Sequence, residues 1–146
     1  MIEARDTNGD LLCVCIIHDD SNRLTSYSDS LWKSAAIYFA ADTDGLPGVE
    51  IVLTYAVDGG GGVGVVRDHT EETRTYTFLG DSPAIQQIGD FDRAQGQEVC
   101  VLLSHRREYV LITDRVNQQQ TVTDCMPAQI HTTKPRGGDP LRSGLT

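Results

Sequence analysis

Acidic residues recur at the same spacing in two segments, and their carboxylate oxygens are the ligands that hard cations prefer. When Asp42 is set on Asp90, segments 40–53 and 88–102 superpose without a gap. The other matched pairs are Asp44 with Asp92, Gly48 with Gly96 and Glu50 with Glu98. An apolar run follows each unit. The spacing predicts two copies of one structural unit, a loop that leads into a strand.

Each copy contains three carboxylates that could bind calcium. Calcium takes six to eight oxygen ligands, and alternate side chains of a tight loop can point at one centre. The candidate ligands are Asp42, Asp44 and Glu50 in one copy, and Asp90, Asp92 and Glu98 in the other. In the alternative without metal, the aspartates accept backbone N–H groups and the glutamate ties the loop's end to its start. This second alternative is favoured, because Leu46 and Ala94 stand where a further acid is expected.

A third, weaker copy lies near the amino terminus. In segment 4–17, Asp6, Asn8 and Gly9 align with the other two copies, but Val14 stands at the glutamate position. The three loop motifs, near 6–14, 42–50 and 90–98, predict one repeat domain over residues 1–131.

The phrases ADTDGLPGVEIVL and GDFDRAQGQEVCVLL resemble the FG-GAP and VCBS-type repeats of β-propeller proteins, which include the integrin α-subunit head. This resemblance implies blade-like antiparallel sheets, an extracellular or cell-surface location, and a role in binding a protein or a glycan. It also implies calcium as the candidate cofactor.

Short β-type runs separated by turn residues predict an all-β chain of antiparallel hairpins, a partial or assembled β-propeller. The expected strands cover 11–17, 50–55, 63–67, 73–78, 98–103, 109–113 and 118–122. Segment 28–41 has the composition of a helix, but the repeat favours a strand over 35–41. We expect Ile51, Leu53, Val63, Val65, Val99 and Val101 to pack between sheets, with Tyr76 and Phe78 extending that core.

Composition excludes some partners. The chain has 146 residues, with 12 Lys and Arg against 21 Asp and Glu, a net charge of -9. An acidic surface repels phosphate backbones and anionic lipid, so we expect no nucleic-acid or membrane binding. No apolar run reaches the ~20 residues of a membrane helix, which predicts a soluble protein. The amino terminus shows no secretory signal, so the protein is either intracellular or a piece of a longer chain.

Other reactive residue types fit structural roles. Cys13, Cys15, Cys100 and Cys125 are expected to be small core residues, and Trp32 a packing residue. The tetraglycine 59–62 lacks the GK[ST] ending of a phosphate-binding loop and predicts a flexible hairpin turn. The four histidines, His18, His69, His105 and His131, form no HExxH or HxxxH pair, so no zinc site is expected.

These observations predict a noncatalytic recognition or scaffold module. The alternative is a small propeller-type hydrolase or lyase, or an accessory domain of one. Three motifs are fewer than the four to eight blades of a closed ring, so self-association through open blade edges is expected. Residues 132–146 are expected to form an extended tail or linker.

Overall fold

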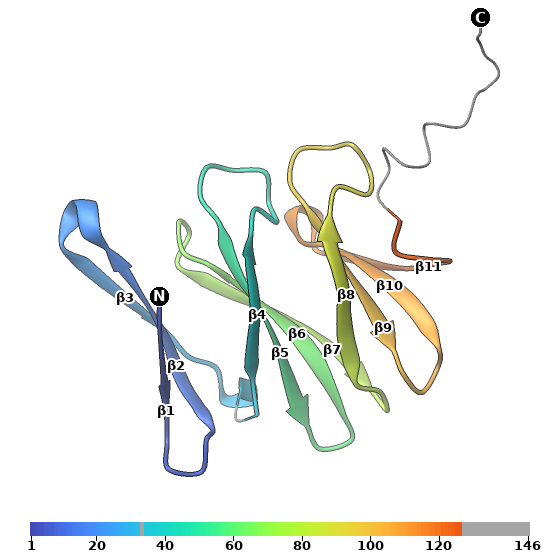
Figure 1. Cartoon of the computed structure of the whole chain (residues 1–146), viewed down its shortest axis with the longest axis horizontal. Helices are drawn as coiled ribbons and strands as arrows, with labels where there is room; N and C mark the ends of the chain where they lie inside the picture. Colours follow the sequence, from blue (N-terminus) through green and yellow to red (C-terminus); the bar gives the residue numbers. More distant parts are fainter. Residues whose placement is uncertain (33, 127–146) are drawn as a thin grey trace, which may run out of the picture.

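The computed structural model describes residues 1–32 and 34–126, which form three antiparallel sheets in a row (Figure 1). The first sheet contains β1 (Ile2–Arg5), β2 (Leu11–His18) and β3 (Arg23–Tyr27). The second contains β4 (Ala36–Ala41), β5 (Glu50–Val57), β6 (Gly60–Arg67) and β7 (Glu72–Leu79). The third contains β8 (Pro83–Gly89), β9 (Glu98–Leu103), β10 (Glu108–Thr113) and β11 (Gln118–Val122). The prediction of an all-β fold is confirmed.

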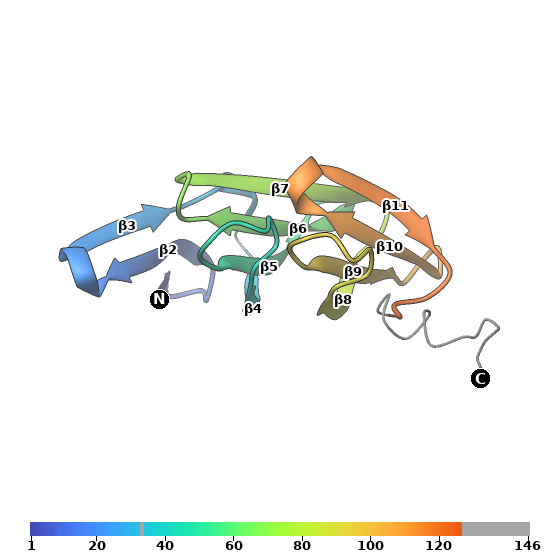
Figure 2. The same cartoon turned by 90° about the horizontal axis from the view of Figure 1, so that it is seen from above.

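In every sheet the strand order follows the chain, so each sheet is a meander of neighbouring hairpins. Viewed from above, the sheets follow one another along the molecule (Figure 2). The described residues close into no barrel or ring. Their helical turns are three short 3-10 segments, η1 (Asp19–Ser21), η2 (Ser30–Trp32) and η3 (Asp114–Val116). In this part of the chain no helix is long and apolar enough to cross a membrane.

The segment with helical composition forms η2 and then strand β4, as the repeat predicted. Three strands were not predicted: β1, β3 and β8. All three lie at a sheet edge, where one side of the strand has no neighbour. Edge strands carry polar residues on exposed positions, and so lack the apolar run on which the prediction relied. The expected tail, 132–146, lies outside the described residues.

The tetraglycine is mostly strand, which corrects the prediction of a flexible turn. Only Gly59 lies in the turn, and β6 begins at Gly60. Tyr55, Gly62 and Thr77 are cross-strand partners, and the Tyr55 hydroxyl reaches over β6 to Thr77 Oγ1 at 2.6 Å. A Cβ on Gly62 would lie 2.3 Å from the Tyr55 ring. The glycine is therefore required by side-chain packing over the strand.

The second sheet is buried on both faces. One cluster joins it to the first sheet and the other joins it to the third. The first cluster contains Leu11, Val14, Tyr27, Trp32, Ala35, Ile51, Leu53, Tyr55 and Val66. The other contains Val52, Val63, Val65, Tyr76, Phe78, Val99, Val101, Leu103, Val110 and Ile112. All eight residues predicted to form the core are buried, and so is Trp32.

Two cysteines form a disulfide, which corrects the expectation that all four are unpaired core residues. Cys100 in β9 is bonded to Cys125, with 5.7 Å between their Cα atoms. The bond ties the segment that follows β11 back to the buried strand β9. Cys13 and Cys15 are free, with their sulfur atoms 3.6 Å apart.

Candidate functional site

Loop 42–49 joins β4 to β5, and loop 90–97 joins β8 to β9, so the two matched acidic segments occupy equivalent places. Both loops lie at the same end of the sheets (Figure 1). The loop at 6–10 joins β1 to β2 and lies at the opposite end, where the β5–β6 turn also lies. The structure therefore gives this weak copy a different place from the other two.

Aspartates hold the turns of both acidic loops through backbone N–H groups. Asp42 Oδ1 accepts Gly45 N at 2.7 Å, and Asp44 Oδ1 accepts Leu46 N at 2.9 Å. The other loop repeats these bonds: Asp90 Oδ1 accepts Arg93 N, and Asp92 Oδ1 accepts Ala94 N. These bonds are the ones that the metal-free alternative predicted.

A buried glutamate closes each loop. Glu50 Oε2 accepts Thr43 N at 2.6 Å, and Glu98 Oε2 accepts Phe91 N at 2.8 Å. Both glutamates are fully buried at the start of a central strand. Burial raises the pKa of each carboxyl, because the charged form loses water. The backbone N–H in each loop partly offsets this rise.

The two loops differ in the basic side chain that faces the remaining oxygens. In the third sheet, Arg115 donates to Asp92 Oδ2 and to Glu98 Oε1 at 3.0 Å. Burial would raise the pKa of Asp92, but this guanidinium outweighs it and the pKa is lowered. In the second sheet, His69 Nε2 lies 3.0 Å from Asp44 Oδ2, and His69 Nδ1 lies 3.7 Å from Glu50 Oε1.

His69 and Arg115 occupy equivalent positions in two sheets. Each directly follows an aspartate at the end of a central strand, Asp68 after β6 and Asp114 after β10. The next turn contains a residue with positive φ in both cases, Glu71 at 55° and Asn117 at 54°. The turns after β6 and β10 are therefore equivalent, and each presents a basic side chain to the acidic loop of its own sheet.

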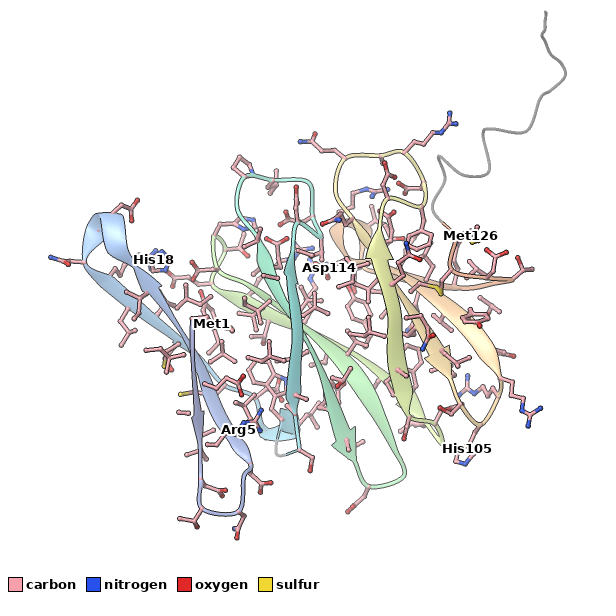
Figure 3. All side chains as sticks on the ribbon, viewed as in Figure 1. Met1, Arg5, His18, His105, Asp114 and Met126 are labelled. Carbon is pink, nitrogen blue, oxygen red and sulfur yellow. A yellow bond between two sulfur atoms is a disulfide. The ribbon has the colours of Figure 1, made fainter. Side chains whose placement is uncertain are left out.

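The same aspartates join each sheet to the one before it. Tyr76 of β7 donates to Asp114 Oδ1 at 2.6 Å, and Arg67 of β6 donates to Asp114 Oδ2 at 2.9 Å. Thr43 of loop 42–49 also donates to Asp114 Oδ2. The Asp114 side chain is 0% exposed and that of Arg67 is 8% exposed. We call this group the Asp114 contact; Figure 3 shows Asp114 between the second and third sheets.

The first and second sheets meet through a homologous group. Tyr27 of β3 donates to Asp68 Oδ1 at 2.5 Å, and His18 Nε2 of β2 lies 2.9 Å from Asp68 Oδ2. We call this group the Asp68 contact. Tyr27 in β3 corresponds to Tyr76 in β7. His18 is the last residue of β2, as Arg67 is the last residue of β6. Burial, followed by the bonded aspartate, raises the pKa of both tyrosines, which therefore stay protonated donors at neutral pH.

A recess lies beside the Asp68 contact, whereas beside the Asp114 contact two loops touch. Between the second and third sheets the acidic loops touch: Gln97 N donates to Asp42 O, and a Cβ on Gly96 would lie 2.9 Å from Gly45 N. Residues 2–27 form three strands and no loop equivalent to 42–49. At the junction of the first and second sheets, a recess with a volume of about 580 Å³ lies next to loop 42–49.

The recess has apolar walls and a polar side. The apolar lining residues are Met1, Ile16, Ala40, Pro47, Val49 and Ile51, and the polar ones are His18, Arg23, Asp68 and His69. Among the side chains that the structure describes, none of the lining residues is aromatic. A volume within the range of about 300–1,000 Å³ is typical of ligand pockets.

Three of the site residues were missed by the sequence analysis: His69, Arg115 and Asp114. A signal for them is present, because VVRDH and LITDR each place an aspartate and a basic or imidazole side chain after an apolar run. These strand ends lie outside the repeated acidic loops, so the loop repeat gives no signal for them.

The sulfur of Cys100 is bonded to Cys125 and is therefore not a free thiol nucleophile. Comparison with protein-family models, curated proteins and solved structures finds no match to this chain.

Proposed function

We propose that this chain is a noncatalytic recognition module, made of propeller-like blades, that binds a protein partner in the recess between its first two sheets. The four-stranded antiparallel meanders of the second and third sheets support the blade interpretation. The observation that carries the proposal is the recess itself: the equivalent place at the next junction is filled by a protein loop.

The lining favours a protein over a glycan. Sugar rings are commonly held on exposed aromatic faces, but Trp32 is 0% exposed and the described lining residues of the recess include no aromatic side chain. Val49 is 55% exposed beside Pro47, and apolar side chains of a peptide would bury such surface. The loop that fills the equivalent place makes a backbone hydrogen bond, Gln97 N to Asp42 O. A peptide can repeat such bonds.

A displayed library of random peptides tests this proposal. Peptides selected on the chain are expected to bind the control Leu79→Asp equally and Val49→Asp at least about tenfold more weakly, a difference of about 1.4 kcal/mol. Leu79 is 72% exposed and lies outside the recess lining, so Leu79→Asp adds the same negative charge without altering the recess. Selected peptides that ignore Val49→Asp would overturn the proposal. A specific signal on a glycan array or in a hydrolase screen, with no peptide selected, would also overturn it.

A further inference from the structure

Two buried carboxylate oxygens lie beside His69 without a hydrogen bond. Among the described residues, Asp44 Oδ2 and Glu50 Oε1 have no donor, although the Asp44 side chain is 2% exposed and that of Glu50 is 0% exposed. Arg67 Nη1 is 3.9 Å from Asp44 Oδ2, but this guanidinium already donates to Asp114. A buried charge without a hydrogen bond is costly, and a cation at this place would neutralise both oxygens.

The third sheet shows which place that cation takes. The equivalent oxygens, Asp92 Oδ2 and Glu98 Oε1, both accept from Arg115. A fixed positive charge therefore neutralises that loop, and any metal ion would have to displace it. In the second sheet the same place holds an imidazole, whose nitrogen has a lone pair that can bind a metal ion.

The donor set indicates the class of ion. One nitrogen and two carboxylate oxygens, all within 4.8 Å of one another, are contributed by Asp44, Glu50 and His69. Zinc binds carboxylate oxygen and imidazole nitrogen at about 2.0–2.2 Å, and three protein ligands leave a fourth position open. Calcium instead takes six to eight oxygens. Asp42 Oδ1, Asp44 Oδ1 and Glu50 Oε2 already accept backbone N–H groups, which counts against an all-oxygen shell.

We propose that Asp44, Glu50 and His69 bind one divalent ion of the zinc class, at the position that Arg115 fills in the third sheet. His69 also lines the recess, with 29% of its side chain exposed, so an ion can reach the site from that recess. The sequence excluded zinc because no two histidines have a suitable spacing. The fold assembles a different set, one histidine with two acids. Loop 90–97 binds no such ion, because its guanidinium is already in place.

Calorimetric titration with zinc chloride at pH 7 tests the site. All variants carry Cys13→Ser and Cys15→Ser, because two free thiols 3.6 Å apart also bind zinc. One ion per chain is expected. His69→Gln should weaken binding by at least about 100-fold, since even indirect partners of a metal ligand are worth about 10–100-fold. His105→Gln is the control and should leave the titration unchanged. Zinc binding that survives His69→Gln would overturn the proposal.

Exchanging the side chains at positions 69 and 115 gives a sharper test. His69→Arg reproduces the third-sheet arrangement, so the variant should keep its melting temperature and lose zinc. Arg115→His should create a second site and raise the stoichiometry to two. A folded Arg115→His protein that still binds one ion would contradict the role of Arg115. A parallel titration with calcium chloride separates the ions: calcium binding that is tighter than zinc and persists in His69→Gln would replace this proposal with an oxygen-only site.

Discussion

The Asp68 contact and the Asp114 contact join neighbouring sheets through equivalent residues at three positions. These residues are buried to different degrees in the two contacts. At the Asp114 contact, a guanidinium and a tyrosine hydroxyl bind an aspartate that is 0% exposed. At the Asp68 contact, an imidazole replaces the guanidinium, and the side chains of His18 and Asp68 are 18% and 16% exposed. The Asp114 contact excludes water, whereas the Asp68 contact borders the open recess. A repeated contact can thus stabilise one junction and leave a binding surface at the next.

The choice of cation fits this difference. Arginine keeps its charge at every physiological pH and presents several donors to one carboxylate, which suits a buried aspartate. Arg67 donates to both the side chain and the carbonyl oxygen of Asp114, and Arg74 donates to the same carbonyl. Histidine can exist without charge, and the partly exposed Asp68 contact tolerates the loss of that charge. We therefore expect the two junctions to respond very differently to the same substitution.

The largest expected effect is the loss of the buried aspartate. Asp114→Ala leaves the Arg67 guanidinium buried without its partner, and breaking such a pair costs about 3–5 kcal/mol. Asp68→Ala removes a partly exposed contact and should cost about 1 kcal/mol. Urea unfolding of both variants measures the difference in the free energy of unfolding. Equal losses would show that the junctions are energetically alike and that burial does not distinguish them.

The second effect concerns how each outer sheet is held. The third sheet has the Cys100–Cys125 disulfide, which spans 25 residues, whereas the first sheet has free Cys13 and Cys15. Cys100→Ala with Cys125→Ala should lower the free energy of unfolding by about 3 kcal/mol. Cys13→Ser with Cys15→Ser, the matched control, should change it by less than about 1 kcal/mol. A reducing agent should reproduce the first result in the native chain; no change on reduction would contradict it.

The sequence predicted the parts of this fold that depend on local pattern. Apolar runs identified the central strands, and the repeated acids identified the loops, because both are encoded within a dozen neighbouring residues. Glu50 and Glu98 close the loops as the hydrogen-bonded alternative predicted. Whether either loop binds calcium stays a prediction.

The parts that were missed depend on distant residues. His69 reaches Glu50, Arg115 reaches Glu98, and Cys100 reaches Cys125 only after strands have paired. The glycines of β6 were mistaken for a turn because the Tyr55 ring that requires them comes from the neighbouring strand. Spacing along the chain does not encode such contacts, although the repeated strand ends VVRDH and LITDR offered a partial signal.

The smallest expected effect is a difference between Glu50 and Glu98 in how each loop-closing glutamate changes stability with pH. Burial raises the pKa of Glu50 above its usual 4.5, so the folded state holds the proton more tightly than the unfolded state. The stability that this group contributes is therefore present below about pH 4.5 and is lost as pH rises through the raised value. Glu50→Gln removes that loss, and with EDTA present it should gain about 1 kcal/mol or less relative to the native chain between pH 4 and 7.

Glu98→Gln is the matched control for this last effect. The pKa of Glu98 is also raised by burial, but its carboxylate accepts from Arg115, and the neutral amide weakens that ion pair. Since the weakened ion pair offsets part of the gain from removing a buried charge, this variant should gain less stability at pH 7 than Glu50→Gln does. Thermal unfolding across the pH range measures both. A gain for Glu98→Gln equal to that of Glu50→Gln would mean that Arg115 contributes nothing to its loop, and that the two acidic loops are electrostatically equivalent.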